Sequence, residues 1–181
     1  MSKGEYRLHS HCEKRGVNVG AAIVFIALIG FLVLGVKAMY GSPNEHSFDE
    51  LISQAAMRYG VDENLVRAII KQESNYDPNA ENPFDPSYGL MQITAGAATD
   101  YGLTDLSPEK LKDPQTNLLC GTWYLAHFLD RYDLDASIQM YNEGEGNYLQ
   151  GKRVPDYLAK VKGYLDEYNS SSTESDDTEG N

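Results

Sequence analysis

DENLVRAIIKQESNYDP, residues 62–78, combines a helix start, an apolar stripe and a helix end within one short segment. Asp62 is a typical N-cap residue. Apolar residues recur at helical spacing from Val66 to Ile70, and Glu73 continues the same stripe. The segment therefore predicts a helix that aims one carboxyl group at the core or at a cleft.

The position of Glu73 favours a carboxylic acid that keeps its proton. Burial penalises the charged carboxylate, and the negative end of the helix dipole penalises it again. Both effects raise the pKa of the side chain, which suits a general acid that works near neutral pH. Ser74 and Pro78 follow at the expected helix end.

Helical patterns continue on both sides of this segment, and no stretch alternates well enough to predict a strand. Residues 79–87 are rich in Asn, Asp and Pro and are expected to form a loop. Further helices are predicted from a capping box at Ser47–Glu50 to Tyr59, from Asp113-Pro114 to Tyr132, over Ala136–Tyr141, and from Pro155 to Tyr168. The fold class is mainly α, with one helical domain over residues 47–168.

Residues 17–36 carry no charge and are almost wholly apolar. At about 1.5 Å per residue such a helix spans the roughly 30 Å of a bilayer, so we expect a transmembrane anchor over 17–38. Basic residues precede it, which places the short tail 1–16 in the cytoplasm and the rest of the chain outside the membrane. Residues 39–46 are then a linker, and a cleaved signal peptide is the competing interpretation.

The net charge of −12 argues against nucleic acid as a partner. Residues 169–181 contain no apolar side chain to bury and are expected to form a disordered acidic tail. Asp130, Asp133 and Asp135 lack the glycine and the closing Glu of a calcium loop, so they predict a solvated acidic face. Neither a metal nor a cofactor is predicted.

Two further segments are hard to explain by packing alone. In residues 87–94, Gly89 permits a close backbone approach, and Gln92 offers an amide among apolar neighbours. In residues 140–146, a helix end leads into glycines with Tyr141 and Asn142 at the turn. Aromatic rings and side-chain amides are groups that bind an N-acetylated sugar, which presents apolar ring faces and amide hydrogen-bonding groups.

With these residues the chain resembles the lytic transglycosylases of the soluble (SLT) type, whose fold is lysozyme-like and related to goose-type lysozymes. Four motifs occur in order across about 110 residues: Glu-Ser-x-x-x-Pro, Gly-Leu-Met-Gln, Tyr-Asn-x-Gly and a late Tyr before a helix that contains Val161. The segment 113–125 also resembles a helix of that family. Two positions depart from the pattern, since Thr94-Ala95-Gly96 replaces a common Pro and Glu143 replaces a small residue.

The resemblance implies cleavage of the β-1,4 bond between N-acetylmuramic acid and N-acetylglucosamine in peptidoglycan, with a 1,6-anhydro sugar as the product. Glu73 would act first as the acid and then as the base. The residues that would bind substrate are Ser74, Gly89, Leu90, Met91, Gln92, Tyr141, Asn142 and Tyr157.

Two alternatives remain open at the level of sequence. A muramidase that uses water needs a second carboxylate roughly 6.5–9.5 Å from the first, and Asp85, Glu143 and Glu145 are the candidates. A non-catalytic wall-binding module of a secretion or conjugation assembly is the other, although such a module has no need of a protonated acid.

Overall fold

The computed structural model describes the backbone of residues 45–176 and the side chains of residues 46–172. The predicted tail 1–16, the predicted anchor 17–38, most of the predicted linker and residues 177–181 lie outside this range. Among the helices of the described part, none combines the length and the apolar character that crossing a membrane requires.

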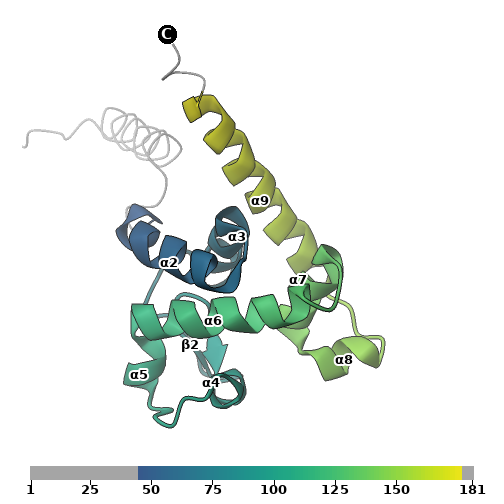
Figure 1. Cartoon of the computed structure of the whole chain (residues 1–181). Helices are drawn as coiled ribbons and strands as arrows, with labels where there is room; N and C mark the ends of the chain where they lie inside the picture. Colours follow the sequence, from purple (N-terminus) through teal and green to yellow (C-terminus); the bar gives the residue numbers. More distant parts are fainter. Residues whose placement is uncertain (1–44, 177–181) are drawn as a thin grey trace, which may run out of the picture. The chain divides into compact units, whose positions relative to one another are not determined.

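The described chain is mainly helical, with one small sheet (Figure 1). Its elements are the 3-10 helix η1 (Glu45–Phe48), α2 (Asp49–Tyr59), α3 (Glu63–Ser74), β1 (Glu81–Asn82), β2 (Ser87–Tyr88), β3 (Ile93–Thr94), α4 (Ala95–Tyr101), α5 (Pro108–Lys112), α6 (Pro114–Leu129), α7 (Leu134–Glu143), α8 (Glu145–Leu149) and α9 (Pro155–Asp176).

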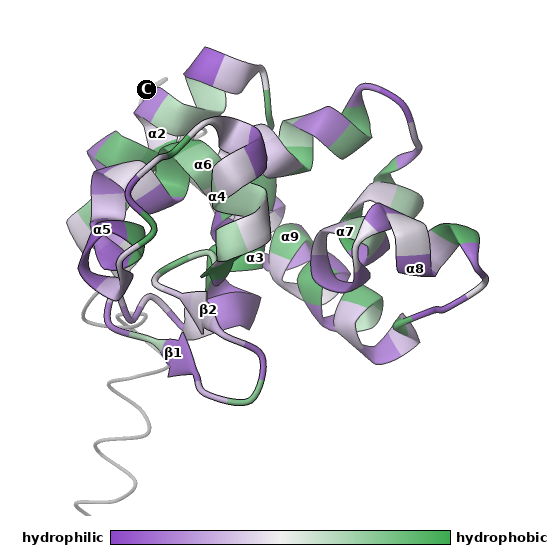
Figure 2. Cartoon of the chain, turned by 90° about the horizontal axis from the view of Figure 1, so that it is seen from below, coloured by the Kyte–Doolittle hydropathy of each residue, from purple (hydrophilic) through white to green (hydrophobic). Residues whose placement is uncertain are grey.

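Helix α6 lies at the centre of the domain, with α2 on one side and α4 and α5 on the other (Figure 1). Its buried side chains include Leu118, Leu125 and Phe128. Helix α3 packs between α2 and α9 and contributes the buried Val66, Ile69 and Ile70. Figure 2 shows apolar residues gathered along α6, whereas β1 is hydrophilic. The predicted apolar stripe of α3 is therefore confirmed as core.

Three predicted helix starts can be compared with the structure. The side chain of Asp62 accepts a hydrogen bond from the Leu65 N–H, and that of Asp113 accepts one from the Thr116 N–H, so both predicted N-caps are confirmed. The capping box at Ser47 is wrong. The chain enters α2 through η1, so Phe48 takes the N-cap position and makes no side-chain cap.

The absence of strands was also a wrong prediction. β1, β2 and β3 form an antiparallel sheet, in which Glu81 pairs with Tyr88 and Ser87 pairs with Thr94. Each strand has two residues, which is too short to show a period of two in the sequence. This sheet connects the end of α3 to the start of α4.

The C-terminal helix extends further than the sequence predicted. A disordered tail was expected from residue 169, but α9 continues to Asp176. The hydroxyl groups of Ser170, Ser171 and Ser172 donate to carbonyl oxygens four residues earlier, and the Asn64 amide donates to Asn169 at 2.9 Å. The serine hydroxyl groups are thus satisfied within the helix, and the contact with α3 supports helix where composition alone predicts disorder.

Candidate active site

Glu73 lies in the last turn of α3, which ends because Asn75 adopts a left-handed conformation with φ of 50°. The carboxyl group is partly buried, and the Tyr157 hydroxyl donates to its Oε1 atom at 2.5 Å. Burial raises the pKa of Glu73 to about 7, against the opposing effect of the Tyr157 hydrogen bond. Near neutral pH this carboxyl group can therefore both release and accept a proton.

Two buried tyrosines stand near Glu73. Tyr157, in the first turn of α9, is 9% exposed, and Tyr141, in α7, is 8% exposed. Burial, followed by the charge of Glu73, raises the pKa of both phenols well above the usual value. Both hydroxyl groups therefore stay protonated and act as hydrogen-bond donors. The predicted residues Glu73, Tyr141 and Tyr157 come together although they are on three different helices.

Ser74 fixes the helix that carries Glu73. Its Oγ lies 2.8 Å from the Leu90 carbonyl oxygen and 3.2 Å from that of Ile70. The hydroxyl group is therefore engaged by the backbone, and it ties the end of α3 to the segment after β2. This contact gives Ser74 a positioning role for the neighbouring Glu73.

The side chains of Leu90 and Met91 have 0% exposure and pack in the core. The substrate contact predicted for them stays a prediction, and the structure gives their backbone a positioning role. The Met91 carbonyl accepts the Tyr141 hydroxyl at 2.8 Å, and the Met91 N–H donates to Asn117 at 2.8 Å. This backbone links α6 and α7 to the end of α3.

Gly89 and Asn117 form the closest packing in this region. Gly89 has a φ of +74°, and a Cβ atom there would lie 2.5 Å from Nδ2 of Asn117. That amide is 1% exposed and donates to the carbonyl oxygens of Tyr88 and Leu111, both at 2.7 Å. Gly89 thus leaves room for the amide, which is a structural reason for glycine here. The sequence analysis assigned no role to Asn117.

A cavity of about 220 Å³, hereafter the first cavity, collects three of the predicted amide and aromatic residues. The Gln92 amide is held by Ser87 Oγ and by the Gly89 carbonyl, both at 3.0 Å. The Asn142 amide is exposed and has no hydrogen-bond partner within residues 46–172. The lining consists of Asp85, Gln92, Ile93, Thr94, Ala97, Tyr124, Tyr141, Asn142, Glu143 and Gly144.

Glu73 does not line the first cavity, but Tyr141 does, and the charge of Glu73 acts on that phenol. Asp85 and Glu143, two of the candidate second carboxylates, also line it. Glu143 forms an ion pair with Lys152 at 2.5 Å. The third candidate, Glu145, lies elsewhere, in a second cavity.

The second cavity, of about 280 Å³, was missed by the sequence analysis. Its lining comes from α4, α6 and α8: Asp100, Trp123, Tyr124, His127, Phe128 and Glu145. Tyr124 belongs to both cavities. The available signal was the spacing of four aromatic rings on α6, Trp123 with His127 and Tyr124 with Phe128, each pair one helical turn apart.

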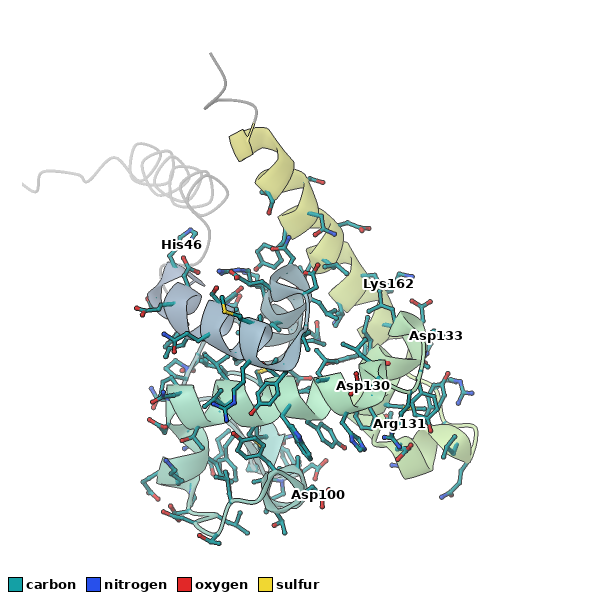
Figure 3. The ribbon with its side chains drawn as sticks, viewed as in Figure 1. His46, Asp100, Asp130, Arg131, Asp133 and Lys162 are labelled. Carbon is teal, nitrogen blue, oxygen red and sulfur yellow. The ribbon has the colours of Figure 1, made fainter. Side chains whose placement is uncertain are left out.

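The three aspartates predicted to be a solvated face are all exposed, which confirms the prediction. Asp133 accepts a hydrogen bond from the Ala136 N–H and caps α7, and Asp135 pairs with Lys162 at 2.8 Å. Asp130 lies at the end of α6. Figure 3 labels Asp133, which precedes α7 as its N-cap, and Lys162 of α9.

A helical domain with this element order and a partly buried, readily protonated glutamate defines the lysozyme-like class. The fold is similar to that of an inactive Glu-to-Gln mutant of the lytic transglycosylase Slt from Pseudomonas aeruginosa, with a TM-score of 0.60 and 21% identity over 72% of this chain and 25% of that one. The chain belongs to the transglycosylase SLT domain family, whose model matches residues 50–160.

Similar proteins carry related names. The chain is 35% identical over 121 residues to membrane-bound lytic murein transglycosylase C from Photorhabdus laumondii, covering 58% of this chain and 33% of the relative. For the Klebsiella pneumoniae protein of that name the identity is 35% over 161 residues, with 81% and 42% covered. The 70-kDa soluble lytic transglycosylase from Escherichia coli has 26% identity and a TM-score of 0.51, with 65% and 19% covered. The chain thus spans less than half the length of these relatives.

Proposed function

We propose that this protein is a peptidoglycan lytic transglycosylase, which cleaves the β-1,4 bond between N-acetylmuramic acid and N-acetylglucosamine and leaves a 1,6-anhydromuramic end. The observation that carries the proposal is Glu73, whose pKa of about 7 fits a group that must give and then take a proton. The family and the names of the relatives support the same activity.

The geometry supports different roles for the two carboxyl oxygen atoms of Glu73. Oε1 accepts the hydrogen bond from Tyr157, so the proton is available on Oε2. That proton passes to the glycosidic oxygen, which leaves with the bonding electron pair, and the neighbouring acetamido group stabilises the sugar cation. The carboxylate then takes the proton of the sugar's 6-hydroxyl as this oxygen attacks the anomeric carbon. Glu73 ends protonated, and no water is consumed.

We propose that Gln92, Tyr141 and Asn142 hold the N-acetylated sugar in the first cavity. The exposed Asn142 amide and the partly exposed Gln92 side chain line that cavity together with two aromatic rings, Tyr124 and Tyr141. Amide groups satisfy the acetamido substituent, and ring faces pack against the apolar faces of the sugar.

We propose that residues 17–36 anchor the protein in the cell membrane in a single pass, with the N-terminus in the cytoplasm and the domain on the outer side. The apolar run and the flanking basic residues support this arrangement, as do relatives named membrane-bound. There the domain would meet peptidoglycan. A place in wall-spanning secretion or conjugation machinery stays a prediction from the sequence.

The test is mass spectrometry of fragments released from purified peptidoglycan by the full chain in detergent, compared with Glu73→Gln. Anhydromuramic ends from the wild type and none from the variant are expected. Glu109→Gln, on α5, is the matched control and should cleave normally. Wall binding without any fragments would instead support a non-catalytic binding module.

A muramidase is the second candidate, because Asp85 and Glu143 line the first cavity. A hydrolase would release reducing ends and would lose activity in Asp85→Asn or Glu143→Gln, since one of these carboxylates would have to activate water. A transglycosylase should keep its anhydro product in both variants.

A further inference from the structure

The second cavity has walls of two kinds. One wall is aromatic, formed by Trp123, Tyr124 and Phe128 of α6. The other carries two carboxylates, Asp100 from α4 and Glu145 from α8. In Figure 3, Asp100 is labelled below α6, on the side from which side chains of α6 project. Aromatic faces next to carboxylates are the surroundings that bind an organic cation.

The two carboxylates, Asp100 and Glu145, differ in whether a neighbouring cation pairs with them. Glu145 accepts the Tyr132 hydroxyl at 2.7 Å and pairs with Arg131 at 3.0 Å, and these contacts hold its pKa below the usual value. Asp100 is exposed and has no ion-pair or hydrogen-bond partner among residues 46–172. Both charges act on the Tyr124 phenol and, after burial, raise its pKa. Of the two carboxylates, Asp100 is therefore the one that forms no ion pair within the described residues and stays open to a ligand from solvent.

A neutral sugar fits this cavity less well than it fits the first. His127 stacks on Trp123 with ring centres 5.8 Å apart and covers part of the indole face on which a sugar would pack. Tyr101 meets the same indole edge to face at 5.6 Å. The ring surface that remains, together with Asp100, suits a small cationic group rather than a broad sugar ring.

We propose that the second cavity binds the alkylammonium group of a diamino acid in the peptide stem of peptidoglycan. This inference rests on the proposed function, because it takes the stem attached to the glycan as the ligand. The shared residue Tyr124 puts the second cavity next to the first, so a stem that branches from a sugar in one can reach the other. Asp100 then supplies the counter-charge, and the α6 rings pack against the methylene groups and the cation.

The tryptophan of this cavity provides a direct measurement of binding. Trp123 is the only tryptophan in the chain, so its fluorescence reports the occupancy of this site. The full chain in detergent is titrated with the tripeptide L-Ala-γ-D-Glu-L-Lys and with the same peptide acetylated on the lysine side-chain amine. We expect a saturable change with the free amine and affinity about tenfold lower for the acetylated peptide, the size of effect that a carboxylate and a cation–π contact together provide.

Variants separate the carboxylate from general charge effects. Asp100→Asn should bind both peptides equally and weakly, whereas Glu109→Gln, which removes a charge from α5, should keep the preference for the free amine. Equal binding of both peptides by the wild type, or no fluorescence change with either, would overturn the proposal. A change with chitotriose and none with the peptides would overturn it in favour of a sugar site.

The binding measurement is independent of bond cleavage. If the wild-type chain binds the amine but releases no fragments from peptidoglycan, the proposed activity fails while the amine site stands. If it releases anhydro fragments without discriminating between the peptides, the amine site fails alone. For active protein, acetylation of wall amines should lower kcat/KM in the wild type and leave that of Asp100→Asn unchanged.

Discussion

Two opposing effects set the proton affinity of Glu73. Burial raises its pKa, and the hydrogen bond from Tyr157 lowers it by stabilising the carboxylate. Because the two contributions come from different residues, a substitution can remove one and leave the other. The pH dependence of activity therefore measures how each contribution affects the protonation of Glu73.

Tyr157→Phe should raise the pKa of Glu73, because it removes the one hydrogen bond within the described residues that counteracts burial. Loss of a hydrogen bond to a charged group corresponds to roughly one pH unit. The alkaline limb of the kcat/KM profile, measured on purified peptidoglycan, should therefore move upward by about that amount. Tyr148→Phe, on α8, is the control and should leave the profile in place; an unmoved limb in Tyr157→Phe would contradict the assignment.

Glu73→Gln should change stability in a pH-dependent way. A carboxyl group whose pKa is raised from 4.5 to about 7 favours folding below pH 4.5, and this contribution is lost as the pH rises through 7. The variant should therefore gain stability relative to the wild type at pH 8, on the order of 3 kcal/mol, and little at pH 4. Thermal unfolding at both pH values measures it. An equal difference at the two pH values would mean that Glu73 has an ordinary pKa.

The sequence could predict Glu73 but could not predict Asn117. Glu73 continues an apolar stripe, so its burial follows from local spacing. The role of Asn117 depends on the carbonyl groups of Tyr88 and Leu111, which come close only in the folded chain. The motif that contains Leu90 and Met91 likewise gave no sign that both side chains pack in the core.

At the scale of elements, the short segment from β2 to β3 depends on a glycine with no room for a side chain. Gly89 has a positive φ, and so does Gly60 at the end of α2, but only Gly89 has neighbours within reach of a Cβ atom. Substitutions at the two positions therefore distinguish the cost of a left-handed backbone from the cost of a steric clash.

Gly89→Ala should destabilise the fold by roughly 3 kcal/mol or more, because it adds displacement of the Asn117 amide to the cost of a left-handed backbone. Gly60→Ala should cost only about 1 kcal/mol, since nothing lies within 4 Å of its Cβ position. Urea unfolding of the two variants gives the comparison. Similar losses would show that the Asn117 contact contributes nothing.

Element prediction succeeded where a local chemical signal existed. Asp62, Asp113 and Pro155 marked helix starts because capping and the fixed φ of proline act within a few residues. Ser107-Pro108 carries the same signal for α5, a helix absent from the sequence prediction. The strands could not be predicted, because two residues per strand gain their pairing from the turn geometry and not from any sequence period.

At the scale of the whole molecule, α9 closes the domain against α3. The hydroxyl groups of Tyr168 and Tyr76 lie 3.1 Å apart, and Leu165 packs against the core. The helix continues beyond these contacts to Asp176. Truncation at two positions can therefore distinguish the part of α9 that stabilises the fold from the part that only lengthens the helix.

A chain ended after Tyr168 should lose less than about 1 kcal/mol, because it keeps both contacts and gives up mainly exposed hydrogen bonds. A chain ended after Tyr164 should lose roughly 2–4 kcal/mol, because Leu165 and Tyr168 are gone. Urea unfolding followed by circular dichroism measures both. A large loss in the longer chain would assign a structural role to residues 169–176.

Three hydrogen bonds fix two consecutive residues, Leu90 and Met91. The Ser74 hydroxyl donates to the Leu90 carbonyl, the Met91 N–H donates to Asn117, and the Tyr141 hydroxyl donates to the Met91 carbonyl. These hydrogen bonds limit where the protein can tolerate an insertion or a deletion. An extra residue between 75 and 89 would have to be absorbed without moving either end, since both ends are fixed. The loop 104–106 is exposed throughout and makes no such contacts with the core, so it can change length. Insertions and deletions among diverging copies of this gene should therefore accumulate in that loop and avoid the stretch behind the catalytic acid.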